Sequence, residues 1–85
     1  MNREEIFKTV QLIIREQMTL NVCGKKIIPD LISEDDTLKS LGMDSLDVLT
    51  IGYKLEVKFN ISIDDIDWLS MLSVKDMVDA IMSRK

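Results

Sequence analysis

The two ends of the chain carry apolar residues at the spacing of amphipathic helices. In residues 4–18 they recur about once per turn, and acidic residues occupy the first turn, where a helix favours them. This first set is Ile6, Phe7, Val10, Ile13, Ile14 and Met18. Near the other end, Ser73 and Asp76 stand at the two positions of a capping box. The apolar residues that follow at helical spacing are Val74, Met77, Val78 and Ile81. The pattern predicts one helix over 4–18 and another that begins after Ser73.

Residues 19–43 lack this period and predict a long loop, with one helical turn near 37–41. The residues that interrupt a helix here are Gly24, Pro29 and Gly42. The loop also contains the acidic run Glu34-Asp35-Asp36, which we interpret first as a solvated segment. Loops of this length in a compact domain are usually functional or are held by their own side chains.

A short helix is predicted over residues 64–69. Ser62 is a candidate cap for it, and Asp64 and Asp65 suit the start of a helix. Trp68 would close this helix as a core or rim aromatic residue.

The middle of the chain, residues 49–63, allows two interpretations. Its sequence LTIGYKLEVKFNISI alternates apolar and polar residues, which is typical of a half-buried strand. A helix, which turns about 100° per residue, would place the same residues on two apolar stripes. The first stripe is Val48, Ile51, Leu55 and Phe59, and the second is Leu46, Leu49, Tyr53 and Val57. Asp47, Lys54 and Lys58 would lie between the stripes.

Three features favour the helix. Asp44 or Ser45 can cap it, and a lone long strand among helices would have no strand to pair with. Gly52 would weaken a strand, although it also costs a helix about 1 kcal/mol. The periodicity by itself leaves both interpretations open. A helix would bury one stripe and offer the other to a partner or a bound group.

The composition is that of one globular domain over residues 1–85. Of the 85 residues, 46% are hydrophobic and 31% are charged. No apolar run reaches the roughly 20 residues that span a membrane. The acidic first residues lack the basic start and apolar core of a signal peptide. We therefore expect a cytoplasmic protein without a membrane span.

The ionisable residues exclude several classes of function. The chain has no histidine, so it lacks the commonest general base, and its only cysteine, Cys23, rules out an intrachain disulfide or a Cys-based zinc site. The acidic residues 64–67 lack the spacing and the glycine of a calcium loop, so no metal site is expected. A net charge of −4 argues against nucleic acid and favours a partner with a basic surface. The sequence indicates a protein that is acted upon and not an enzyme.

The stretch LGMDSLD, residues 41–47, resembles the attachment motif of acyl carrier proteins. The stretch LEVKF, residues 55–59, is similar to the Leu-Glu-x-x-Phe that follows in that family, and Ile63 and Asp65 come next. With the amphipathic first and last helices, the resemblance covers most of the chain. It implies an all-α four-helix bundle with a long loop between the first and second helices and a short third helix. The second helix would start at Ser45.

The resemblance implies a covalent cofactor on Ser45. This serine would carry 4′-phosphopantetheine in a phosphodiester, added from coenzyme A by a phosphopantetheinyl transferase that recognises Asp44. The thiol of the arm would hold an acyl group as a thioester. The chain would then be a monomeric carrier that presents acyl intermediates to acyl-loading, acyl-transfer or ketosynthase-type enzymes. Trp68 would either belong to the core or line an acyl pocket.

The second stripe is the expected docking surface for these enzymes. Its residues are Leu46, Leu49, Tyr53 and Val57, with Asp47 and Glu56 beside them. Between Asp44 and Phe59 the chain has three acidic and two basic residues, whereas carriers of fatty acid synthesis have a strongly acidic second helix. This departure indicates a specialised lipid or polyketide-type pathway. A peptidyl or aminoacyl carrier of a nonribosomal pathway, or an unmodified helical interaction module, remains an alternative.

Overall fold

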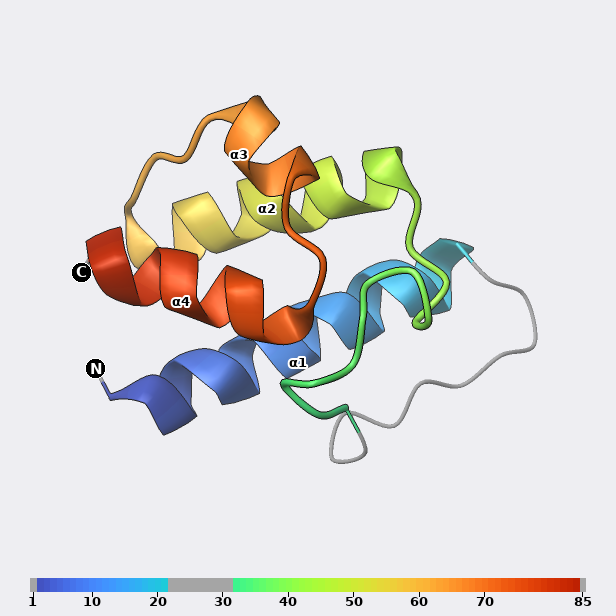
Figure 1. Ribbon diagram of the computed structural model, residues 1–85, viewed down its shortest axis with the longest axis horizontal. Helices are drawn as coiled ribbons and strands as arrows, with labels where there is room; N and C mark the ends of the chain where they lie inside the picture. The colour runs from blue at the N-terminus through green and yellow to red at the C-terminus, as the bar shows by residue number, and fades with distance from the viewer. Residues whose placement is uncertain (1, 22–31, 85) are drawn as a thin grey trace.

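The computed structural model describes residues 2–21 and 32–84, and these residues form four helices and no strand. The helices are α1 (Arg3–Asn21), α2 (Ser45–Phe59), α3 (Asp65–Leu69) and α4 (Val74–Arg84). In Figure 1 the three longer helices form a bundle, the short α3 lies on α2, and both ends of the chain lie at the same end of the bundle. The predicted all-α four-helix bundle is confirmed. None of the described helices is long and apolar enough to cross a membrane.

The middle of the chain is helical, as the two-stripe interpretation predicts. Asp44 caps the start of α2, and Asn60 ends it in the left-handed conformation, with a φ of 55°. The buried face of the helix consists of Val48, Ile51, Gly52, Leu55 and Phe59. This face contains the whole first stripe, so the alternating pattern arose from a helix with two apolar faces and not from a strand.

The core lies where α1 meets α2 and α4, and α3 packs on α2, with Trp68 against Gly52 of its buried face. From α1 come Ile6, Val10 and Ile14, and from α4 come Val74, Met77, Val78 and Ile81, all of them buried. These are the apolar residues whose spacing predicted the two helices. Burial of such side chains supplies the main favourable term for a domain of this size.

The short helix begins with a different cap from the one predicted. Asp64 is the residue before α3, and its side chain makes no capping hydrogen bond. Ser62 lies further away and is exposed, and its carbonyl accepts a hydrogen bond from Nε of Arg84 (3.2 Å). The prediction that Ser62 caps this helix is therefore wrong. What fixes α3 is Trp68, which is buried on α2.

The segment that leads to α2 is fastened to the start of α4. The N–H groups of Val74 and Lys75, the first two of α4, donate to the carbonyls of Asp36 (3.0 Å) and Glu34 (2.9 Å). A helix cannot satisfy these N–H groups by itself, so the segment supplies the missing acceptors. The predicted capping box of α4 is also present. The N–H of Ser73 donates to the carboxylate of Asp76 (3.2 Å), and the N–H of Asp76 donates to the hydroxyl oxygen of Ser73 (3.3 Å).

Arg3 connects the same segment to both terminal helices. Its guanidinium pairs with the carboxylates of Glu34 and Asp79, the second at 2.6 Å. These hydrogen bonds raise the pKa of Arg3. Further along α1, the buried side chain of Gln11 donates to the carbonyl of Ile32 (2.8 Å). Glu34 is thus engaged in the fold and is not a purely solvated residue of the loop.

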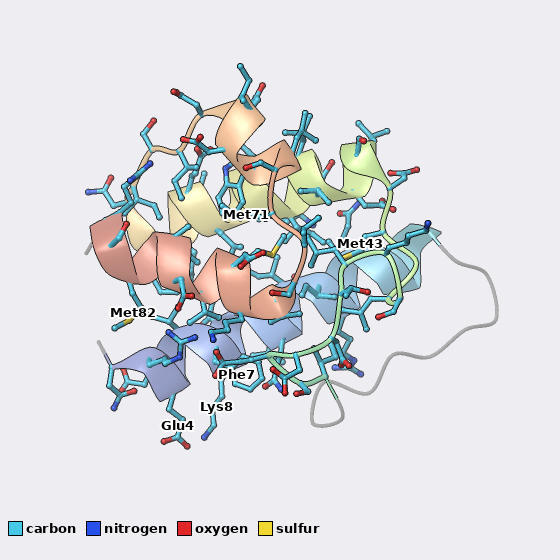
Figure 2. All side chains as sticks on the ribbon, viewed as in Figure 1. Glu4, Phe7, Lys8, Met43, Met71 and Met82 are labelled. Carbon is cyan, nitrogen blue, oxygen red and sulfur yellow. The ribbon has the colours of Figure 1, made fainter. Side chains whose placement is uncertain are left out.

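The outer face of α1 is polar and solvated. Figure 2 shows Glu4 and Lys8 pointing away from the bundle, and their charged groups lie 3.5 Å apart. An exposed pair one turn apart adds only about 0.3–0.5 kcal/mol. This face therefore carries little of the stability, which comes from the opposite, apolar face.

Candidate functional site

A hydrogen-bonded turn, anchored by buried side chains at its two ends, leads into the candidate attachment site. The helical turn predicted near 37–41 is present over residues 38–42. The N–H of Met43 donates to the carbonyl of Leu38 (3.1 Å), and both side chains are buried. Figure 2 shows Met43 beside the start of α2. Gly42 has a φ of 83°, which a residue with a side chain adopts only under strain. The turn is therefore anchored, and it fixes the direction in which α2 begins.

A reciprocal pair of aspartates holds the first turn of α2. The side chain of Asp44 accepts a hydrogen bond from the N–H of Asp47 (2.9 Å), and the side chain of Asp47 accepts one from the N–H of Asp44 (3.2 Å). This is a capping box with aspartate at both positions. Because Asp44 is the cap, Ser45 is the first residue inside the helix. Ser45 is therefore not the capping residue.

The side chain of Ser45 is exposed and uncommitted. Among the described residues, its hydroxyl has no hydrogen-bonding partner, and the N–H groups of Ser45 and Leu46 have none either. Free N–H groups and the helix dipole make a helix start favourable for an anion. The two neighbouring carboxylates oppose an anion by their like charge, but both are bonded to backbone N–H groups. The hydroxyl therefore fits a phosphate ester, which is the link that 4′-phosphopantetheine requires.

The outer face of α2 carries three strongly exposed apolar side chains. Leu46, Tyr53 and Val57 are 72%, 67% and 64% exposed, as a docking surface requires, whereas Leu49 is partly buried against the core. Glu56, also predicted for docking, turns inward, and its carboxylate accepts a hydrogen bond from the N–H of Ile63 (2.7 Å). Asp47 belongs to the capping box. The candidate docking face is thus apolar, with fewer available acids than the sequence suggested.

A groove of about 520 Å³ runs between α1 and α2 beside this face. Its lining residues are Thr9, Leu12, Ile13, Glu16, Tyr53, Lys54, Val57 and Lys58. Leu12 was not among the predicted docking residues, because it lies off the periodic apolar set of α1; it is half exposed. A large apolar residue on the polar side of an amphipathic helix was the available signal. The candidate docking face is therefore continuous with a groove that α1 also lines.

The part of the chain that the structure describes offers no other candidate chemistry. In it, no three residues among His, Cys, Asp and Glu lie close enough to hold a metal ion. Cys23, Gly24 and Pro29 lie outside the described residues. The candidate site therefore consists of Ser45, the turn that holds it and the face beside it.

Comparison with known proteins places these features in one family. The family described as "Phosphopantetheine attachment site" matches residues 21–81. The acyl carrier protein of Helicobacter pylori is 39% identical over 80 residues, which cover 94% of this chain and 95% of the relative. That of Cyanidium caldarium is 35% identical over 82 residues, with coverage of 96% and 88%.

Solved structures agree with this assignment. An acyl carrier protein from Enterococcus faecalis matches with a TM-score of 0.76 and 29% identity, over 100% of both chains. An acyl carrier protein from Thermotoga maritima matches with a TM-score of 0.71 and 26% identity, over 93% of this chain and 89% of that one. The bundle described above is therefore the fold of these carriers.

Proposed function

Because this chain belongs to the acyl carrier proteins, within the phosphopantetheine-attachment family, we propose that it carries acyl intermediates as thioesters for partner enzymes of a specialised cytoplasmic pathway. Members of the family are carriers and not catalysts, and they hold covalently attached 4′-phosphopantetheine. The thiol of that group forms the thioester. The protein itself supplies the attachment residue, a fixed position for it and a surface that partners recognise.

Ser45 is the proposed attachment residue. It stands first in α2 with an exposed, unpartnered hydroxyl, which is the observation that supports the proposal most directly. Nothing beside it needs to act as a base, because the transferase brings its own catalytic groups. The capping box fixes the backbone that presents the hydroxyl, and the free N–H groups at the helix start favour the phosphodiester. Asp44 is the proposed recognition residue for the transferase.

Intact mass spectrometry tests this assignment. The apo protein is incubated with coenzyme A and a promiscuous phosphopantetheinyl transferase. We expect a gain of one phosphopantetheine in the wild-type protein and none in Ser45→Ala. Ser40→Ala is a matched control, because Ser40 is an exposed serine in the preceding turn, and it should be modified like the wild type. An unmodified wild-type protein with a native circular dichroism spectrum would reduce the chain to a helical interaction module.

The docking face supports a specialised set of partner enzymes. Leu46, Tyr53 and Val57 form an exposed apolar stripe. The two acidic residues of α2, Asp47 and Glu56, are half-buried and accept hydrogen bonds from backbone N–H groups. Lys54 and Lys58 lie toward the C-terminal end of α2, beside the groove. Partners that rely on a continuous acidic helix would find little of it here, so apolar contact has to supply more of the affinity.

A general fatty acid ketosynthase tests the specialised role. The holo protein, loaded with an acyl group, is supplied to that enzyme beside a carrier of fatty acid synthesis. We expect much slower turnover with this protein. Turnover equal to that of the fatty acid carrier would show that the altered charge of α2 does not restrict its partners.

A further inference from the structure

The ring of Trp68 lies directly on the backbone of α2. Trp68, the only tryptophan of the chain, is 1% exposed. A Cβ atom added to Gly52 would lie 2.7 Å from both Cδ2 and Cε2 of the ring, and 2.9 Å from Nε1. These distances are shorter than van der Waals contact allows. The ring therefore occupies the space that a side chain at position 52 would fill.

Glu56 holds the edge of the same ring. Nε1 of Trp68 donates to Oε1 of Glu56 at 3.5 Å, and the same oxygen accepts the N–H of Ile63 at 2.7 Å. Ile63 is buried and lies in the connection between α2 and α3. Gly52 and Glu56 are one helical turn apart, so α2 contacts the ring on its face and at its nitrogen. The ring is held in one position between the two helices.

We infer that Trp68 closes the space between α2 and α3 to the acyl cargo, so that short acyl groups on the arm stay in solvent; this rests on the proposed function. Protein interiors are close-packed, so a chain can enter only where a side chain leaves. A buried tryptophan removes about 150–250 Å² from water, which equals the burial of roughly five to eight methylene groups. A hexanoyl chain has only about five apolar carbons beyond its carbonyl, the lower end of this range, so it gains nothing by displacing the ring.

The test compares acyl groups of two lengths on the same protein. A promiscuous transferase is supplied with acetyl- or hexanoyl-coenzyme A. Oγ of Ser45 forms a bond to the phosphorus of the acyl-phosphopantetheine, the pyrophosphate bond breaks, 3′,5′-ADP leaves, and the serine proton passes to a base of the transferase. Intact mass confirms the loading. The fluorescence emission of Trp68 and the rate of thioester cleavage by hydroxylamine are then measured.

In the wild-type protein we expect the same emission maximum with acetyl and hexanoyl groups, and equal cleavage rates. In Trp68→Ala the vacated space admits the hexanoyl chain. Each methylene group that it buries slows cleavage up to about fourfold, so we expect cleavage of the hexanoyl group to be roughly tenfold slower than that of the acetyl group. A wild-type protein whose hexanoyl group is protected, with a shifted Trp68 emission, would overturn the inference.

A second variant guards against loss of the fold. Trp68→Leu removes part of the ring and leaves an apolar filler, so it should protect the hexanoyl group less than Trp68→Ala does. If neither variant folds, the wild-type measurement still decides between a closed and an open interior. Absence of loading would count against Ser45 as the attachment residue, whereas loading followed by protection would overturn only the closed interior.

Discussion

Replacing Gly52 with alanine changes the free energy of unfolding in two opposite ways, through helix propensity and through packing. Alanine is better than glycine inside a helix by about 0.8–1.0 kcal/mol, so propensity alone predicts a more stable protein. The added Cβ would, however, lie 2.7 Å from two ring carbons of Trp68. Extra atoms in a packed core typically cost about 1–3 kcal/mol. Since the overlap is with a rigid ring, we expect packing to dominate and the free energy of unfolding to fall by about 1–2 kcal/mol.

Urea denaturation followed by circular dichroism measures this change. For a domain of this size, a loss of 1 kcal/mol lowers the melting temperature by about 4–8 °C. The fluorescence of Trp68 reports separately whether the ring has moved. A Gly52→Ala protein that is more stable than the wild type would refute the reasoning, because it would mean that the ring yields at no cost.

A double-mutant cycle identifies the ring as the cause. In a Trp68→Leu background the overlap is relieved, so Gly52→Ala should be neutral or stabilising there. The two substitutions should therefore couple by at least about 1 kcal/mol, within the range seen for residues in contact. Additive effects would place the cost of Gly52→Ala somewhere other than its contact with Trp68.

Three further substitutions test the turn, the α2–α3 connection and the ion pairs. Gly42→Ala forces a side chain into the left-handed region, so it should cost about 1–2 kcal/mol in urea denaturation, and no loss of stability would contradict the assigned φ. Glu56→Ala leaves the N–H of Ile63 without its acceptor and should cost about 1–3 kcal/mol, whereas Glu56→Gln keeps an acceptor oxygen and should recover most of that. Arg3→Ala should lower the melting temperature slightly, and less at high salt. Glu34 and Asp79 raise the pKa of Arg3, so the ion pairs contribute fully to stability at every pH below the usual pKa of arginine. The decrease in melting temperature caused by Arg3→Ala should therefore be equal at neutral pH and at about pH 10.

Features that depend on neighbours in the sequence could be predicted from it. The capping box at Ser73 and the apolar faces of the first and last helices follow local rules, and the structure contains them. The second helix was ambiguous because both of its stripes are apolar, and only the packing of α1 and α3 decides which stripe is buried. The choice of Ser62 as a cap failed because a serine at a helix start is only one of several possible caps.

Features that depend on distant residues could not be predicted. Gly52 looked like a defect in a helix, since nothing near it in the sequence shows that Trp68 needs its space. Glu56 looked like an exposed acidic residue. Its two hydrogen-bond donors, the N–H of Ile63 and the ring nitrogen of Trp68, become its neighbours only in the folded chain. The candidate serine was found through its motif, whereas the anchoring of the turn before it by the buried Leu38 and Met43 became clear only with the fold.

The hydrogen bonds between the segment before Ser45 and the start of α4 affect the order in which parts of the protein fold during synthesis. The carbonyls of Glu34 and Asp36 leave the ribosome long before Val74 and Lys75, which donate to them. Contacts between residues so far apart in the sequence form late in folding, because a long loop has to close first. During synthesis, the segment that precedes the candidate attachment serine therefore lacks these bonds until the last helix has been made and docked. The site is completed last, so its final shape reports that the whole domain has folded.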